Sequence, residues 1–457
     1  MDDEYDVIVV GGGPAGENAA GRCAEGGLQV CLVESELLGG ECSYWACMPS
    51  KTLLRPSEVL AAARRVPGAR EAVTGEVDVD ATLARRNWMT SDWDDEGQAR
   101  WVESVGVALV RGHGRLAGPK AVEVDGRRLT ARKAVVVATG SDPNPPPIPG
   151  LADVRHWESR EATSAKEVPE RLVVIGGGVV GVEMAQAWRR LGAAEVTIVE
   201  PGPRLLSREE RFAGEEVRAA FEAEGIVVIT GRRATSIEQH ADDGPVTAVF
   251  DDGRHVEADE ILVATGRRPR TTDLGVETVG LEGGKPIAVD DHLRATDMEG
   301  GWLYAVGDVN GRVLLTHMGK YQAKVAADHI LGRDVAVAAP VPRVIFTDPQ
   351  VAAVGLTEAQ ATEQGMDVRA VSVPTGSVAA ASIHGDDFVG TSQLVIDAAR
   401  DVVVGATFTG PGVSELLHSA TVAIVGEVPL ATLRHAVPSF PTLSEVWLNL
   451  LEAYPAH

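Results

Sequence analysis

Two stretches of the chain share one pattern of apolar and polar positions. Residues 5–34 read YDVIVVGGGPAGENAAGRCAEGGLQVCLVE, and residues 171–200 read RLVVIGGGVVGVEMAQAWRRLGAAEVTIVE. Each has a β-branched apolar run, a glycine turn, a stretch with helical spacing, a second apolar run and a final glutamate. The pattern predicts a strand–helix–strand unit written twice. An internal repeat of this kind indicates two related dinucleotide-binding domains.

The stretches around the repeat complete the predicted organisation. A polar region with helical spacing covers about residues 50–105, and the proline-rich end of residues 134–150 is typical of a linker. ILVATGRRP at 261–269 closes the second unit, and GWLYAVGDVNG follows at 301–311. From about residue 340 the pattern changes to strands and helices without a glycine turn. We therefore predict an α/β fold with two doubly wound domains and a third, α+β domain.

The first unit carries a Gly-x-Gly-x-x-Gly turn at Gly11, Gly13 and Gly16. The first glycine permits the tight turn, the second lets the backbone approach a pyrophosphate, and the third lets helix and strand pack closely. The pyrophosphate would lie on the N–H groups at the helix start. Glu34 lies 18 residues past the last glycine, at the end of the next strand. A carboxylate there accepts hydrogen bonds from ribose hydroxyls.

The second unit repeats the turn and its acidic residue at Gly176, Gly178, Gly181 and Glu200. A carboxylate at position 200 binds a free 2′-hydroxyl and repels a 2′-phosphate, which favours NADH as the electron donor. Arg204 and Arg208 follow closely in the sequence, and their positive charges would weaken the repulsion of a 2′-phosphate. NADPH is therefore kept as the alternative donor.

Length and charge narrow the functional classes. The 457 residues predict about three domains, and 42 Lys+Arg against 66 Asp+Glu give a net charge of 42 − 66 = −24. Such an acidic chain is a poor candidate for nucleic-acid binding. No apolar stretch is long enough to span a bilayer, and the acidic N-terminus does not resemble a signal peptide. We expect a cytoplasmic protein with no membrane or nucleic-acid partner.

A pair of cysteines supplies candidate redox chemistry. Cys42 and Cys47 lie in GGECSYWACMPSK, residues 39–51, and no second pair or nearby histidine completes a zinc site, so no metal is predicted. Positions five apart in a regular helix lie about 140° apart, so a disulfide requires Cys42 in a distorted first turn. The helix N-terminus would then lower the thiol pKa. Cys23 and Cys31 are predicted to be buried core cysteines.

The two dinucleotide units and the Cys-x4-Cys-x-x-Pro-Ser-Lys segment resemble the pyridine nucleotide–disulfide oxidoreductases, the family of glutathione reductase, lipoamide dehydrogenase and mercuric reductase. The resemblance covers essentially the whole chain. It implies FAD in the first unit, NAD(P)H in the second, and a homodimer formed through the last domain. The implied domains are FAD-binding (1–150), NAD(P)H-binding (151–272), a central return to the FAD domain (273–339) and dimerisation (340–457).

The resemblance also implies roles for individual residues. Cys47 would be the flavin-proximal thiol and Cys42 the exchanging thiol that attacks substrate. Lys51 would lie near the flavin N5, paired with Glu183. Further FAD contacts are implied at Gly114, Gly140, Gly307, Asp308 and Thr316, and Gly266 matches the second ATG segment. Electrons would pass from NADH through FAD to the cysteine pair and then to an acceptor.

The family's C-terminal signature, His-Pro-Thr-x-x-Glu, is broken in this chain. Residues 439–445 read SFPTLSE, so Phe440 occupies the position of the histidine that acts as acid/base. A phenyl ring transfers no proton, and losing such a group typically costs about 10²–10⁴-fold in rate. Glu445, His435 and Tyr44 are the candidate replacements. A substrate that leaves as an acidic thiol or a thione would need no base.

Three functions fit these observations. The leading hypothesis is an NADH-dependent flavin enzyme that reduces a small, low-molecular-weight disulfide through the cysteine pair. The second is a quinone, dye or metal-ion reductase that bypasses the pair, favoured by Phe440 and by the aromatic Tyr44-Trp45 insert between the cysteines. The third is a weakly catalytic redox sensor that binds FAD and NADH and whose partner reads the state of the cysteines.

Overall fold

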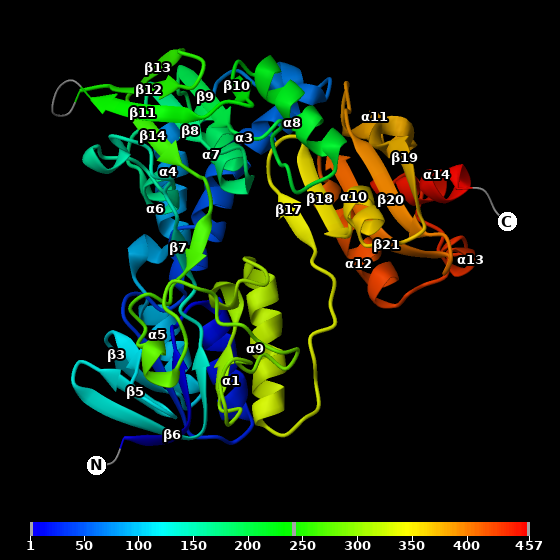
Figure 1. Cartoon of the computed structure of the whole chain (residues 1–457). Coiled ribbons are helices and arrows are strands. Elements are labelled where there is room, and N and C mark those ends of the chain that lie inside the picture. Colours follow the sequence, from blue (N-terminus) through cyan, green and yellow to red (C-terminus); the bar gives the residue numbers. More distant parts are fainter. Residues whose placement is uncertain (1–2, 240–243, 455–457) are drawn as a thin grey trace. The chain divides into compact units, whose positions relative to one another are not determined.

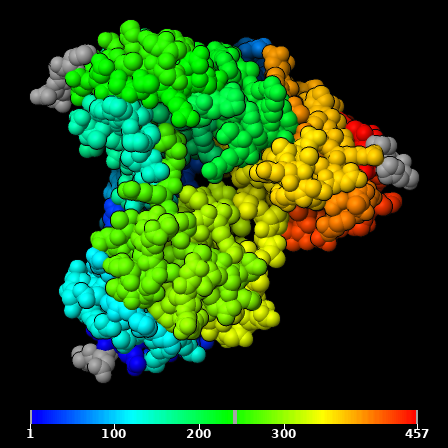
Figure 2. Space-filling model, in the orientation of Figure 1, coloured from blue at the N-terminus to red at the C-terminus, as the bar shows by residue number. Residues whose placement is uncertain are grey.

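The computed structural model describes residues 3–239 and 244–454. The chain forms two compact units, each built from three separate stretches (Figure 1). Unit 1 comprises Met1–Pro49, Arg86–Asn144 and Gly266–Ala338, and unit 2 comprises Ser50–Arg85, Pro145–Thr265 and Ala339–His457. In Figure 2 the stretches of unit 1 gather into one body although they are far apart in the sequence.

A seven-stranded sheet forms the core of unit 1. Its parallel part contains, in spatial order, β3 (Ala108–Arg111), β2 (Val30–Glu34), β1 (Glu4–Val10), β6 (Arg127–Val137) and β16 (Leu303–Ala305). Two further strands, β5 (Ala121–Val124) and β4 (Gly114–Leu116), extend it antiparallel beyond β6. The parallel strands are rich in valine, as expected of strands buried on both faces. Through β16, the segment after the second dinucleotide unit returns to the first sheet.

Helices α1 (Pro14–Glu25) and α9 (Thr316–Ile330) pack side by side in unit 1 (Figure 1). Pro14 begins α1 at a position where its missing N–H costs no hydrogen bond. The remaining elements of the unit are α2 (Gly40–Tyr44), α5 (Glu96–Ser104), the short turn η5 (Gly307–Asn310) and the paired strands β7 (Ser141–Pro143) and β15 (Arg267–Pro269). Helices α3 (Cys47–Arg65) and α4 (Val79–Met89) run across the unit boundaries.

Unit 2 repeats the first architecture on a smaller scale. A parallel sheet orders β10 (Val227–Thr230), β9 (Glu195–Glu200), β8 (Arg171–Ile175) and β14 (Glu260–Val263), with α6 (Ser159–Ser164), α7 (Val179–Arg190) and α8 (Arg211–Ala223) as its helices. An antiparallel meander of β11 (Ala234–Gln239), β12 (Val246–Phe250) and β13 (His255–Ala258) accompanies it. The predicted pair of doubly wound dinucleotide domains is confirmed.

The C-terminal part of unit 2 is α+β, as predicted. Its antiparallel sheet orders β17 (Arg343–Ile345), β18 (Gln350–Gly355), β21 (Val402–Gly410), β20 (Thr391–Asp397) and β19 (Val368–Pro374). Its helices are α10 (Glu358–Glu363), α11 (Ala379–His384), α12 (Leu417–Val425), α13 (Leu430–Leu433) and α14 (Val446–Ala453), with η8 (Leu443–Glu445) before the last. One apolar cluster joins α11, α12, α13 and α14 to the sheet.

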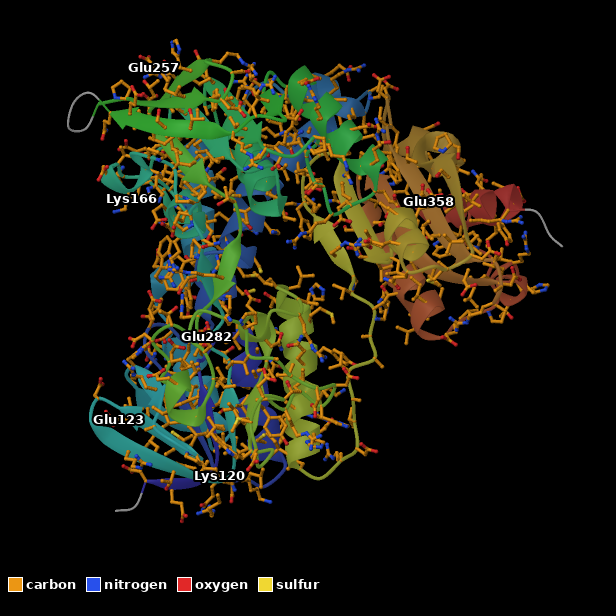
Figure 3. All side chains as sticks on the ribbon, in the orientation of Figure 1. Lys120, Glu123, Lys166, Glu257, Glu282 and Glu358 are labelled. Atoms are coloured by element: carbon orange, nitrogen blue, oxygen red, sulfur yellow. The ribbon has the colours of Figure 1, made fainter. Side chains whose placement is uncertain are left out.

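Charged side chains cover the outer faces of both units. Glu123 on β5 and Glu257 on β13 are exposed and point outward (Figure 3). Within the described ranges, no helix is both long and apolar enough to cross a membrane.

The third glycine of each dinucleotide turn is required by packing. A Cβ atom added at Gly16 would lie 1.8 Å from the carbonyl oxygen of Gly11. A Cβ added at Gly181 would lie 2.0 Å from the carbonyl oxygen of Gly176. Because real Cβ atoms do not approach a backbone carbonyl this closely, any side chain would push the helix away from the strand.

We expect Gly181→Ala to lower the stability of unit 2 by at least about 1–3 kcal/mol, because the added methyl group overpacks a backbone contact that cannot relax. Thermal unfolding followed by circular dichroism measures this loss. Gly178→Ala is the matched control, since a Cβ at Gly178 meets no atom within 4 Å. Equal melting temperatures for the two variants would contradict the packing argument.

Candidate functional site

Both dinucleotide turns are closed by a carbonyl group from the Ala-Thr-Gly segments. Gly11 has φ of +101°, and a Cβ there would lie 2.5 Å from the carbonyl oxygen of Ala138. Gly176 has φ of +114°, and its added Cβ would lie 2.5 Å from the carbonyl oxygen of Ala264. Only glycine combines this backbone conformation with such a close approach. The recurrence of Ala-Thr-Gly in the sequence therefore has a structural reason.

The second glycine of each turn faces open space instead. A Cβ at Gly13 would meet only the Cα of Gly40, at 4.0 Å, and a Cβ at Gly178 would meet nothing within 4 Å. These glycines are the N-caps of α1 and α7, and no side chain of the described residues caps either helix. Each helix start thus presents backbone N–H groups to a space that fits a pyrophosphate. The residues present fit a dinucleotide such as FAD in unit 1.

The glutamates at the ends of β2 and β9 accept hydrogen bonds from backbone N–H groups of the glycine turns and of the loops that follow the strands. Glu34 Oε2 accepts a hydrogen bond from the Gly12 N–H at 2.6 Å, and Oε1 accepts one from the Glu36 N–H at 2.6 Å. Glu200 makes the same pair with the N–H groups of Gly177, at 2.7 Å, and Gly202, at 2.6 Å. Since each carboxylate oxygen accepts more than one hydrogen bond, ribose binding remains compatible with this arrangement.

The two arginines after Glu200 are placed differently from each other. Arg204 donates to the carbonyl oxygens of Leu206, Ser207 and Glu209, each at 2.8 Å. Its guanidinium is therefore already occupied by the backbone. Arg208 is exposed.

Asp308 belongs to a polar network that the sequence did not predict. Its Oδ2 accepts a hydrogen bond from Ser141 Oγ at 2.6 Å, and Ser141 Oγ accepts one from Arg267 Nε at 2.7 Å. Burial raises the pKa of Asp308, while the Ser141 hydroxyl and the charge of Arg267 oppose the shift. Ser141 and Arg267 each directly follow an Ala-Thr-Gly motif, and that position was the available signal.

The remaining glycines assigned by resemblance lie in unit 1. Gly140 and Gly266 immediately precede the paired strands β7 and β15, and both have positive φ, of +73° and +136°. Gly114 begins β4, where a Cβ would lie 2.9 Å from Val33 Cγ1. Gly307, at φ +76°, begins η5 next to α1. Their contacts with FAD stay a prediction.

The two cysteines lie on different helices. Cys42 is on α2, and Cys47 is the first residue of α3. The chain leaves helical geometry at Trp45, where φ is −136° and ψ is 0°. This break removes the 140° separation that a continuous helix would impose, so no distorted first turn is needed. The structure holds both residues as thiols.

The thiols meet beside Thr316, the first residue of α9. Cys47 Sγ lies 3.3 Å from Thr316 Oγ1. Hydrogen bonding with Cys47, followed by burial, raises the pKa of Cys42, and the Thr316 side chain and the Lys320 charge oppose this. The sequence prediction of a lowered pKa at Cys42 is therefore wrong for the dithiol form. A neighbouring thiol and low solvent exposure outweigh the dipole of the short helix α2.

Lys320 is a neighbour of the dithiol that sequence reasoning missed. It lies one turn after Thr316 on α9, so the two share a face of the helix. Its positive charge favours the thiolate of Cys42. Nothing in the sequence around Lys320 signals this, because the charge effect acts between segments nearly 280 residues apart.

Lys51 and Glu183 form an ion pair within unit 2. Lys51 Nζ lies 2.6 Å from Glu183 Oε2, and the Glu183 side chain is 3% exposed. Glu183 Oε1 accepts a hydrogen bond from the Phe346 N–H at 2.9 Å, and Lys51 Nζ lies 5.2 Å from the centre of the Phe346 ring. The pairing implied by resemblance is thus present, although the position of either residue relative to FAD stays a prediction.

Comparison with known proteins assigns the family. The model of the pyridine nucleotide-disulphide oxidoreductases matches residues 5–327, and the dimerisation domain of the same family matches residues 341–451. The chain belongs to the pyridine nucleotide–disulphide oxidoreductase family. Members are NAD(P)H-dependent flavoproteins that use FAD, and the dimerisation domain supports a homodimer. The predicted family, fold class and C-terminal dimerisation domain are confirmed.

Relatives in this family have different named activities. Dihydrolipoyl dehydrogenase of Thermus scotoductus is 35% identical over 98% of this chain and 97% of its own length. Mercuric reductase of Staphylococcus aureus is 31% identical over 97% of this chain and 81% of its own length. LpdA of Mycobacterium tuberculosis shares the fold with a TM-score of 0.85 at 27% identity, covering 98% of this chain and 99% of LpdA. The flavoprotein disulfide reductase RclA of Escherichia coli superposes with a TM-score of 0.86 at 23% identity, covering 99% of each chain.

The family's C-terminal acid/base is absent from the described site. Phe440 is 76% exposed in the single chain and carries no group that exchanges a proton. Glu445 keeps its place in η8, and its Oε2 is buried without a hydrogen-bond partner among the described residues. His435 is exposed.

Tyr44 is packed into unit 1 and turned to the backbone. It is 1% exposed, and its hydroxyl donates to the carbonyl oxygen of Asp94 at 3.3 Å. Burial raises its pKa to about 12. Tyr44 is consequently a poor proton donor, and its ring serves local packing. Trp45, whose ring centre is 5.6 Å from that of Tyr44, is only partly buried.

A hollow of about 660 Å³ opens on unit 1 among α1, α5 and α9. Its walls carry charged side chains of both signs together with two aromatic rings. They are Glu17, Arg22, Glu25, Trp101, Lys320, Tyr321 and Lys324, with Asn18, Gly21, Gly97 and Gln98. Lys320 thus faces the hollow and also acts on Cys42, which links this space to the dithiol.

We expect Lys320→Met to slow the alkylation of Cys42 by iodoacetamide in the reduced protein by about threefold, because losing the positive charge raises the pKa of the thiol and lowers its thiolate fraction. Peptide mass spectrometry after timed labelling at pH 8 measures the rate. Lys324→Met, one turn further along α9, is the matched control. An equal effect of both variants would show that general charge, and not Lys320, controls the thiol.

Proposed function

We propose that this protein is a cytosolic, NADH-dependent FAD enzyme that reduces a small disulfide through Cys42 and Cys47. One observation carries the proposal: the two thiols lie in hydrogen-bonding contact, with Cys47 against Thr316 at 3.3 Å and the Lys320 charge acting on Cys42. A vestigial pair would not need a neighbouring cation. The arrangement suits a dithiol that is repeatedly oxidised and reduced.

FAD bound in unit 1 would supply hydride acceptance from NADH and transfer of the electron pair to the cysteines. The rest of the reaction belongs to the protein's own sulfur atoms. The Cys42 thiolate attacks one sulfur of the substrate, the substrate S–S bond breaks, and the first thiolate leaves. The Cys47 thiolate then attacks the Cys42 sulfur, which releases the second thiolate and forms the Cys42–Cys47 disulfide. Two electrons move from the dithiol to the substrate.

The hollow beside α9 supports a small polar substrate. Its volume, about 660 Å³, lies in the usual range of small-molecule sites. Arg22 is already held by Asp328, with two hydrogen bonds of 2.8 Å. Lys324 would attract a carboxylate, Glu25 would attract an ammonium group, and Trp101 would pack against aliphatic parts. A low-molecular-weight thiol disulfide carries these groups, whereas a quinone does not need them.

The second candidate function is reduction of a quinone, dye or metal ion without the cysteine pair. Phe440 favours it, because a direct flavin acceptor requires no thiol base. The sensor hypothesis is weaker, since both glycine turns are open for their dinucleotides.

Substitution of single cysteines separates these functions. We expect Cys42→Ser and Cys47→Ser each to abolish NADH-dependent disulfide reduction, because each removes one sulfur of the exchange, while quinone reduction survives. Anaerobic titration with NADH adds a spectroscopic test: a long-wavelength thiolate-to-flavin band should appear in the wild type and vanish in Cys47→Ser. Direct bleaching of the wild-type flavin without that band would refute the dithiol mechanism and leave the second function.

Donor choice is tested at Glu200. We expect NADH to be preferred, because the Glu200 carboxylate would face the ribose and Arg204 is held by three carbonyl groups. Glu200→Ser should cut kcat/KM for NADH about 10-fold or more, the effect of losing a charged hydrogen bond, and should reduce discrimination against NADPH. A parallel loss with both donors would instead mean that only the loop had been disturbed. A wild-type preference for NADPH would contradict the assignment.

A further inference from the structure

Glu17 is a carboxyl group in the wall of the hollow that the reaction described so far does not use. It lies in the first turn of α1, and its Oε1 is buried without a hydrogen-bond partner among the described residues. Burial raises its pKa to about 7, against the opposing charge of Lys320. A carboxyl group that titrates near neutral pH is suited to give and take protons.

The reaction proposed above lacks a proton donor for the leaving thiolate. Phe440 has replaced the histidine, and the Tyr44 hydroxyl is committed to Asp94 with a pKa of about 12. His435 is exposed and does not line the hollow. Glu17 differs from these groups because it lines the space in which the leaving half of a substrate would lie.

We propose that Glu17 is the acid that protonates the thiolate released from the substrate when Cys42 attacks it, an inference that rests on the proposed disulfide reductase function. As the Cys42 thiolate forms its bond to the near sulfur, the substrate S–S bond breaks and its electron pair stays on the far sulfur. The proton of the neutral Glu17 carboxyl passes to that sulfur, which leaves a thiol and a Glu17 carboxylate. A proton from water restores the acid before the next turnover.

The direction of this transfer is favourable. An aliphatic thiol has a pKa of about 8.5, so its thiolate takes a proton readily from an acid whose pKa is about 7. Lys320 connects the two ends of the reaction, because its charge acts on both Cys42 and Glu17. The same ammonium group favours the attacking thiolate and, after the transfer, the Glu17 carboxylate.

The groups around Glu17 fix the sign of its pH dependence. Lys320 on α9 lowers its pKa, while Glu34 on β2 and Asp95 before α5 raise it, together with burial. The Glu17 charge in turn contributes to the raised pKa of Tyr44 on α2. Glu17 donates only when protonated, so disulfide turnover should fall as the pH rises through about 7.

The test compares two disulfides in the FAD-loaded enzyme over pH 5.5–8.5. 2-Hydroxyethyl disulfide releases a basic aliphatic thiolate, whereas 5,5′-dithiobis(2-nitrobenzoate) releases a weakly basic aromatic thiolate that needs no acid. Glu17→Gln should lower kcat with the aliphatic disulfide about 10²-fold and abolish the fall near pH 7. The rate with the aromatic disulfide should stay within about twofold. Glu17→Asp should recover part of the aliphatic rate.

Controls separate the failure of this inference from the failure of the proposed function. Glu123→Gln, on the outer face of β5, makes the same change away from the hollow and should behave as wild type. FAD content and the thiolate-to-flavin band verify that each variant is folded. A wild type that reduces neither disulfide overturns both proposals. A wild type that reduces only the aromatic one, or a Glu17→Gln variant with an unchanged aliphatic rate and pH profile, overturns the role of Glu17 alone.

Discussion

The contact between a glycine and a backbone carbonyl is the constraint on which both dinucleotide units depend. In each unit the first glycine lies against the carbonyl group of an Ala-Thr-Gly segment, and the third glycine lies against the carbonyl group of the first. These approaches leave no room for a Cβ, so they fix where the helix begins relative to the sheet. The second glycine is thereby left open, with the N–H groups of the helix start directed at a dinucleotide.

The dithiol is governed by opposing electrostatic effects. Mutual hydrogen bonding and burial keep the proton on Cys42, whereas Thr316 and Lys320 favour its loss. The Thr316 side chain and the Lys320 charge therefore favour the Cys42 thiolate, which is the form that attacks a disulfide. This balance is set by residues of α9, a helix that begins at the thiols and continues along the hollow. The same helix therefore links the cysteine pair with the hollow.

The residue that this chain lacks from the family pattern is the one expected to transfer a proton, whereas the residues expected to carry electrons are kept. The glycine turns, the cysteine pair and the Lys51–Glu183 pair are all present, whereas the C-terminal histidine is not. Relatives of this chain carry names as different as dihydrolipoyl dehydrogenase and mercuric reductase, so membership of the family leaves the acceptor open. The charged walls of the hollow in unit 1 and the acid within it are the features of this chain that bear on that choice.

The sequence by itself determined the features that are local along the chain. The glycine turns, the cysteine pair, the core cysteines Cys23 and Cys31 and the loss of histidine at position 440 could all be read from short motifs. The tertiary structure decided the rest, because each remaining feature joins distant segments: Asp308 with Ser141, and the dithiol with Thr316 and Lys320. It also reversed the expected pKa shift of Cys42 and placed the Glu17 carboxyl group, with its raised pKa, in the wall of the hollow. Burial and neighbouring charge set a proton affinity, and neither exists until the chain has folded.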